Sequence, residues 1–380
     1  MKTTQLVWRD NSWCGEQAID EAFYSQRCLI LVFGLTDDAP IAIQQLTSRF
    51  VQAEIVGCST AGEITRDEVL DLSLVATVVL FEKGHFFCAY ARLEDYAHDG
   101  FQAGAALTAQ LHQRREDLSH IFILSDGLNV NGAELVRGAR SELPQGVQIT
   151  GGLAGDRQAF VKTYALWQGD YHSEVVVAIG FYGAQLKMGY GSRGGWTAFG
   201  MKRKITRATD NVLYELDDQN ALEVYKSYLG ELSNELPASG LRFPLELEIR
   251  GKDTKLVRTL LAIDEQVGSI TFAGDVPTGA SARLMRANVD SLIDGAQEAG
   301  DIAVSPPPQS KALSILVSCL GRKLLLKQLA EEEVMAVADS LPAQTTLCGF
   351  YSYGEIAPWE INCDAELHNQ TMTITTLWEE

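Results

Sequence analysis

The chain has 380 residues, 46% hydrophobic and 21% charged, a composition typical of globular proteins that build cores of normal size. Its formal net charge of −19 argues against nucleic acid as a partner, because phosphate binding needs a concentrated positive surface. The same charge disfavours anionic membranes, and the longest apolar stretch is far shorter than the roughly 20 residues that span a bilayer, so we expect no membrane insertion.

The N-terminal residues contain no apolar segment of the kind found in signal peptides. The seven cysteines are an odd number, include no Cys-x-x-Cys pair and lie mostly in apolar runs. Such scattered thiols are typical of reduced proteins. We therefore predict a cytoplasmic location.

One arrangement recurs three times along the chain: an apolar strand, an amphipathic helix and a second short strand. The strand pairs are expected at residues 28–34 and 55–58, 121–125 and 147–150, and 313–319 and 345–349. Uninterrupted apolar runs predict strands buried on both faces, and a strand–helix–strand crossover implies a parallel pair. Alternating runs such as residues 74–81 and 371–377 are predicted to add antiparallel strands. The expected class is mixed α/β, with large mixed sheets covered by helices.

The domain boundary is expected after the first long α/β region. A helix is predicted at residues 221–229 and a strand-rich segment at residues 242–288. We accordingly divide the chain into an N-terminal domain, residues 1–213, and a C-terminal domain, residues 214–380.

Two segments share the pattern G-x-x-x-x-G-E-I, each after the closing strand of a strand–helix–strand unit. They are residues 57–64 and 349–356. The pattern predicts two pseudo-related halves that form a sandwich with a cleft between them. Ligands of open α/β sheets bind outside the carboxyl ends of strands, so Glu63 and Glu355 are expected to face that cleft. The alternative is two convergent glycine turns.

The same segments have the frame of a phosphate-binding loop, but Glu63 and Glu355 occupy the lysine position, which excludes nucleoside triphosphates. The two carboxylates form a conceivable acid–base pair. No nucleophile elbow or zinc-binding helix motif accompanies them, so we predict a protein that is not an enzyme and has no catalytic residue.

The six histidines show no metal-ligand spacing, which disfavours a structural zinc site. A haem needs only one axial imidazole. His172 and His368 each precede an apolar strand and are the candidates to point inward as iron ligands.

Several blocks, in order over nearly the whole chain, resemble the FIST family of sensory proteins. Residues 56–64 and 151–156 resemble marks of its N-terminal domain, as do residues 194–196. Residues 221–230, 318–322 and 349–358, closed by residues 368–371, resemble its C-terminal domain. The ligand-binding residues that this resemblance and the motifs indicate are Gly57, Cys58, Ser59, Thr60, Glu63, Gly152, Asp156, Trp196, Arg322, Tyr351, Tyr353 and Glu355.

The resemblance implies a sensor that regulates a separate histidine kinase, diguanylate cyclase or phosphodiesterase. A chain with both domains is similar to the nitric-oxide-sensing FIST haemoproteins, which implies haem held by His368 or His172. The alternative is a small organic ligand such as an amino acid, without haem. In that case Arg322 clamps a carboxylate while Glu63 or Glu355 meets an ammonium group.

Overall fold

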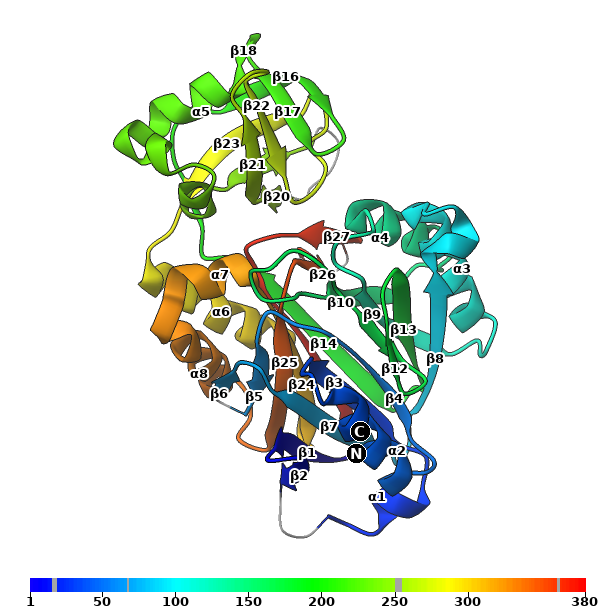
Figure 1. Cartoon of the computed structure of the whole chain (residues 1–380). Helices are drawn as coiled ribbons and strands as arrows, with labels where there is room; N and C mark the ends of the chain where they lie inside the picture. The colour runs from blue at the N-terminus through cyan, green and yellow to red at the C-terminus, as the bar shows by residue number, and fades with distance from the viewer. Residues whose placement is uncertain (16–18, 67, 250–254, 361–362) are drawn as a thin grey trace.

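Three parallel strand pairs form the centres of three sheets in the computed structural model, which describes residues 1–15, 19–66, 68–249, 255–360 and 363–380 (Figure 1). In each pair a helical segment connects the two strands, and all three pairs are parallel, as the strand–helix–strand pattern predicts. The mixed α/β class is confirmed. No described helix is long and apolar enough to cross a membrane.

The first unit supplies the sheet that contains the N-terminus. Its elements are β1 Lys2–Arg9, β2 Ser12–Gly15, α1 Ala22–Ser25, β3 Leu29–Gly34, α2 Ala39–Arg49, β4 Glu54–Cys58, β5 Glu63–Thr65, β6 Glu68–Leu70 and β7 Leu74–Leu80. The second unit repeats this plan. Its elements are β8 His85–Arg92, η1 Leu93–Tyr96, α3 Gly100–His112, β9 Leu118–Ser125, α4 Gly132–Ser141, β10 Gln148–Leu153, β11 Ala165–Trp167, β12 Asp170–His172 and β13 Val175–Tyr182.

The third unit is interrupted by an insertion after its first strand. Its elements are β14 Leu186–Arg193, α6 Val289–Ala303, β24 Ala312–Cys319, α7 Leu320–Leu326, η4 Lys327–Leu329, α8 Ala330–Ser340, β25 Thr345–Ser352, β26 Gly354–Pro358, β27 Ala365–His368 and β28 Met372–Glu379. The crossover between β24 and β25 is divided into α7, η4 and α8, because Lys327 adopts a positive φ of 55° and ends α7.

The insertion forms a separate lobe, drawn above the three-sheet body in Figure 1. Its elements are β15 Thr197–Ala198, β16 Arg203–Thr209, β17 Val212–Leu216, β18 Gln219–Asn220, α5 Ala221–Leu229, η2 Gly230–Glu235, η3 Ala238–Arg242, β19 Leu245–Glu248, β20 Lys255–Arg258, β21 Leu260–Asp264, β22 Ser269–Phe272 and β23 Ser281–Arg286. The predicted boundary between residues 213 and 214 falls inside β17, so it does not coincide with the division between lobe and body.

The three body sheets have the same strand order, and each borrows a hairpin from another unit. The orders are β12-β11-β4-β3-β7-β1, β27-β26-β10-β9-β13-β8 and β6-β5-β25-β24-β28-β14, with β2 added to the edge of the first. Hairpin β5–β6 of the first unit pairs with β25, hairpin β11–β12 of the second with β4, and hairpin β26–β27 of the third with β10. The internal relationship therefore extends to three units rather than two halves.

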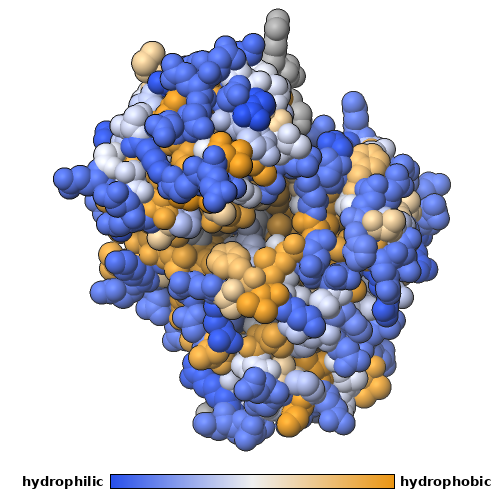
Figure 2. Space-filling view, turned by 45° about the horizontal axis from the view of Figure 1, so that its top comes forward, coloured by the Kyte–Doolittle hydropathy of each residue, from blue (hydrophilic) through white to orange (hydrophobic). Residues whose placement is uncertain are grey.

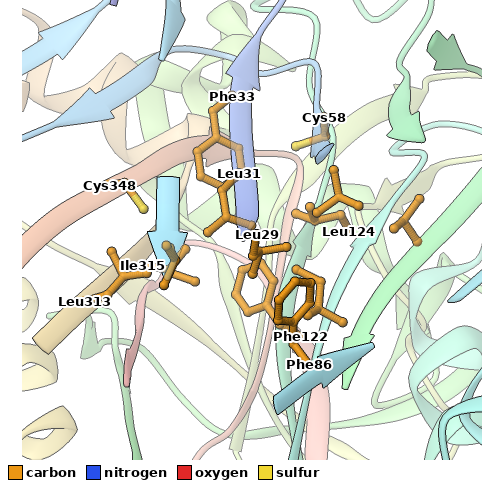
Figure 3. Close-up of a cluster of buried hydrophobic side chains, with 14 of the residues drawn as sticks. Leu29, Leu31, Phe33, Cys58, Phe86, Phe122, Leu124, Leu313, Ile315 and Cys348 are labelled. Atoms are coloured by element: carbon orange, nitrogen blue, oxygen red, sulfur yellow. The ribbon is translucent and has the colours of Figure 1, made fainter. Parts of the chain in front are cut away.

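The core lies where the inner faces of the three sheets meet. Leu31 of β3, Phe122 of β9 and Ile315 of β24 belong to one buried cluster, shown in Figure 3. Helices cover the outer faces and form three further clusters, around α2, around α3 with α4, and around α6 with α8. The lobe has its own core. The chain ends meet on the body, where the Met1 amino group lies 2.7 Å from the Glu379 carboxylate.

Candidate ligand-binding site

A cleft separates the lobe from the body at the carboxyl ends of β9, β24 and β25. An apolar cavity of about 590 Å³ in this cleft is lined from the body by residues that follow these strands, including Leu128, Leu320 and Tyr353. Residues Leu241 and Leu260 close it from the lobe. Figure 2 shows apolar surface in the hollow between the two parts. The position agrees with the rule that places ligands outside strand carboxyl ends.

Few hydrogen bonds hold the lobe against the body. The buried Arg258 of β20 donates from Nη1 to the Leu367 carbonyl, at 2.8 Å, while its Nε donates to Asp275 within the lobe. Burial lowers the pKa of Arg258 to about 10. Asn131 of the body donates to the Asp275 carboxylate at 3.1 Å. A link built from single contacts of this kind is compatible with movement of the lobe.

Two buried polar side chains that line the cavity have no hydrogen-bond partner among the residues that the structure describes. Asn369, in the turn between β27 and β28, is 1% exposed, and neither its Oδ1 nor its Nδ2 is bonded within the described chain. Thr259, between β20 and β21 of the lobe, is 5% exposed and its hydroxyl is also unbonded. Native proteins rarely leave such groups unpaired, so each marks a place where a ligand or water completes the structure.

An aromatic pair stands at the mouth of the cavity. The rings of Phe160 and Tyr353 stack at 4.5 Å, and both line the cleft. Asp156 fixes this arrangement, because its carboxylate accepts the Tyr353 hydroxyl and three backbone N–H groups of residues 160–162. Burial raises the pKa of Asp156, but these hydrogen bonds outweigh it and leave the pKa lowered. Asp156 therefore positions the site rather than facing a ligand.

The second unit holds its cleft loop with a buried carboxylate. Asp126 directly follows β9 and accepts the N–H groups of Leu128 and Asn129, at 2.8 and 2.9 Å. It also accepts the Thr163 hydroxyl and the Glu174 N–H, just before β13. Asp126 thus ties the lining loop to the sheet.

Glu63 and Glu355 have the same surroundings but neither lines the cleft. Glu63 accepts hydrogen bonds from the Thr60 hydroxyl and from Ser73, and Glu355 from the Ser352 hydroxyl and from Thr371. Burial raises the pKa of both carboxyls, that of Glu355 to about 7, although the hydrogen bonds oppose the shift. The expectation that the two carboxylates face a shared cleft is corrected: each ties a turn to the residue just before a long strand, β7 or β28.

Arg322 is not available to clamp a ligand carboxylate, which corrects that prediction. It is fully buried, forms an ion pair with Glu333 of α8 at 2.8 Å, and donates to the carbonyls of Gly194 and Leu292 at 2.7 Å. Tyr351 belongs to the same network, because its hydroxyl donates to Glu333 at 2.8 Å. Burial, followed by the Glu333 charge, raises the pKa of Tyr351 well above its ordinary value. This network joins helices to the sheet.

The remaining predicted residues serve packing and hydrogen bonding within the body. An added Cβ on Gly57 would lie 1.7 Å from the Val32 carbonyl oxygen, and one on Gly152 would lie 2.5 Å from Val317. Burial raises the pKa of the Cys58 thiol well above its ordinary value. The Ser59 hydroxyl accepts the Tyr164 N–H, and the Trp196 indole donates to the Gln370 carbonyl. Of the predicted residues, Tyr353 lines the cleft, while the described contacts of the others are structural.

The two candidate haem ligands do not lie at the cleft. His368 is fully buried, and its Nε2 donates to the Ala357 carbonyl oxygen at 2.9 Å, while Nδ1 has no partner within the described parts of the chain. Burial, with the nearby Arg258 charge, lowers the pKa of His368 to about 4. His172 belongs to the edge strand β12. Neither histidine lines the cleft, so the residues present do not fit a haem there.

Comparison with known proteins identifies the family. The family model for the FIST N domain matches residues 28–219, and that for the FIST C domain matches residues 221–358. The chain belongs to the FIST family. FIST domains are sensory domains that bind small ligands. The chain is also similar to an uncharacterized protein of Methanocaldococcus jannaschii, 25% identical over 55% of this chain. The match spans 45% of that protein's length, so its likeness concerns only part of it.

The two unpaired residues of this FIST protein were missed by sequence reasoning. Asn369 lies inside the family-like run of residues 368–371, where His368 drew attention instead. Thr259 is a lone hydroxyl in an apolar strand region. A polar residue within an apolar segment is the sequence feature that could have indicated these two residues. Whether such a residue lacks hydrogen-bond partners depends on how lobe and body meet.

Proposed function

We propose that this FIST protein is an intracellular sensor whose small organic ligand binds between lobe and body. The ligand changes a surface that a separate histidine kinase or cyclic-di-GMP enzyme reads. The supporting observation is Asn369, whose buried amide has no partner in the wall of a 590 Å³ apolar cavity. A site of this kind, apolar with a few convergent polar groups, is typical of small-molecule binding. No catalytic role is proposed.

Signal transmission follows from the position of the two unpaired groups. Asn369 belongs to the body and Thr259 to the lobe. A ligand that bonds to both gains more free energy when the lobe is closed, and it therefore shifts the population toward that arrangement. The partner needs only to distinguish the two arrangements.

The residues that line the cavity distinguish between the alternative ligands. A free amino acid carries two charges, but the lining of this cavity contains no charged side chain, and Arg322 is committed to Glu333. A nitric-oxide sensor requires haem, and His368 offers only an Nδ1 that is enclosed by protein. A hemin titration decides this point: a stoichiometric Soret band that is lost in His368→Ala would replace our proposal with the haem sensor.

The proposal is tested with Asn369→Leu. Leucine has nearly the same size and removes an unpaired amide, so we expect the free energy of unfolding to rise by about 1–3 kcal/mol without ligand. The same variant should lose the thermal shift that compounds from a small-molecule screen cause in the unaltered protein. Thr259→Val should behave in the same way, more weakly.

The matched control is Asn220→Leu. Asn220 caps α5 by accepting the Glu223 N–H at 3.0 Å, so this change should cost about 1 kcal/mol and leave ligand shifts intact. If Asn369→Leu destabilises the protein as the control does and retains every ligand shift, the cleft is not the site.

A further inference from the structure

A second cavity adjoins the ligand cleft. Its volume is about 650 Å³, and it shares Ala238, Leu241 and Leu324 with the first cavity. Further apolar side chains, such as Leu232 and Leu292, continue the lining between η3 and the start of α6. The two cavities therefore lie side by side and share part of their apolar wall.

Positively charged side chains also line this second cavity. Arg242, Arg286 and Lys327 line it, all three are exposed, and the lining contains no aspartate or glutamate. The chain as a whole has 50 acidic and 31 basic residues. A cavity lined by three cations and no carboxylate therefore differs in charge from the rest of the chain. None of the three forms an ion pair within residues that the structure describes. Arg286 contacts the Phe199 ring, at 5.7 Å.

We infer that the ligand is an amphipathic carboxylate with an internal amide, the chemistry of an N-acyl amino acid. This inference rests on the function proposed above. The Asn369 amide offers an acceptor and two donors, which together match a secondary amide. The apolar walls take the acyl chain, and the cations of the second cavity take the carboxylate, with Arg able to bind it in bidentate fashion.

Simpler ligands leave the Asn369 amide without a partner or bring a charge that the two cavities do not match. A fatty acid satisfies the cations and the apolar walls, but it lacks an amide and leaves Asn369 with a buried, unpaired donor. A free amino acid brings an ammonium group, and no carboxylate side chain lines either of the two cavities. An N-acyl amino acid brings an amide for Asn369 and a carboxylate for the cations, and it adds no ammonium group.

The test is calorimetric titration of the full chain with N-octanoylglycine, its methyl ester and octanoic acid. We expect the acylated amino acid to bind about tenfold more tightly than the ester, because the ester has lost the charge-assisted contacts. The double variant Arg242→Gln with Arg286→Gln should remove this preference and leave the affinity for the ester unchanged. Lys187→Gln, at a partly exposed lysine on β14 that lines neither cavity, is the control and should change neither.

The outcomes separate this inference from the proposed function. If acid and ester bind equally and Asn369→Leu abolishes both, the cleft is the site but the ligand is not a carboxylate. If octanoic acid binds as tightly as N-octanoylglycine, the amide requirement is overturned. If none of these probes binds while other compounds give Asn369-dependent thermal shifts, the ligand class is overturned and the site stands. Because the ester comparison uses the unaltered protein, it holds even if a variant folds poorly.

Discussion

Buried carboxylates with several hydrogen bonds shape this molecule, and this property separates them from the residues that we propose to bind its ligand. Glu63, Glu355 and Asp126 each accept an N–H group from the residue just before a long strand. Their shared role is to hold the turn at a strand carboxyl end. The residues proposed to face the ligand have the opposite property, because the side chain of Asn369 has no hydrogen-bond partner among the described residues.

Glu355 predicts a pH dependence of stability. Its folded-state pKa of about 7 exceeds the ordinary value of 4.5, because burial outweighs the hydrogen bonds from Ser352 and Thr371. The native state therefore binds this proton more tightly than the unfolded state, and stability from this group is fully present below about pH 4.5 and lost as pH rises through about 7. The variant Glu355→Gln has no ionisable carboxyl group at this position, so it lacks this contribution to the pH dependence. Chemical unfolding at pH 5 to 8 should show the unaltered protein losing on the order of 3 kcal/mol relative to the variant; parallel profiles would contradict this.

At the residue scale the sequence predicts which turns matter but not what their side chains do. The shared G-x-x-x-x-G-E-I pattern relates Glu63 to Glu355, and their surroundings are indeed equivalent. Their partners Ser73 and Thr371 lie 10 and 16 residues further on, so no local pattern joins them. The Arg322–Glu333 pair likewise depends on how α8 meets α7, which the sequence does not state.

At the element scale, three glycines set the spacing of the parallel strand pairs. Gly57, Gly151 and Gly349 oppose the facing strand in β4, β10 and β25. An added Cβ would lie 1.7 to 2.0 Å from a carbonyl oxygen of that strand in each case. The backbone on both sides is pinned by sheet hydrogen bonds, so neither strand can move away without breaking pairing.

Alanine at these positions should therefore be costly. We expect Gly349→Ala to lower the free energy of unfolding by at least about 1–3 kcal/mol, the range for overpacked cores, because the collision is with backbone. Gly146→Ala is the control: its φ of +95° is strained for alanine, but a Cβ there meets nothing within 4 Å. Thermal or urea unfolding compares the two. If Gly349→Ala costs no more than Gly146→Ala, the close approach does not set the strand spacing.

The parallel pairs could be predicted from sequence, whereas the exchange of hairpins could not. Long apolar runs identify β3, β9 and β24 because burial on both faces removes alternation. The exchanged strands β5 and β11 have only three residues each, which is too short for a periodic signal. The pairing of β5 with β25 joins residues nearly 300 positions apart, and it is selected by the meeting of three sheets.

At the scale of the whole molecule, the three units exchange hairpins in a closed ring, in which the third unit is followed by the first. Strand β1 occupies in the first sheet the place that β8 and β14 occupy in the others. Those two strands follow β7 and β13 directly, so β1 would follow β28 if the chain were continuous. The 2.7 Å contact between the Met1 amino group and Glu379 places the two chain ends at that junction.

A circular permutant should therefore fold. We would join Glu380 to Met1 through about three Gly and Ser residues, which span roughly 10 Å, and open the chain between Ala184 and Gln185, both exposed in the turn between β13 and β14. Circular dichroism and thermal unfolding should show a cooperative fold, less stable by about 1–3 kcal/mol because Glu379 loses the terminal ammonium but keeps its backbone N–H donors. The same join opened between Phe122 and Ile123, inside the buried strand β9, should not fold. Equal failure of both permutants would show that the order of the units, and not only their closure, determines this fold.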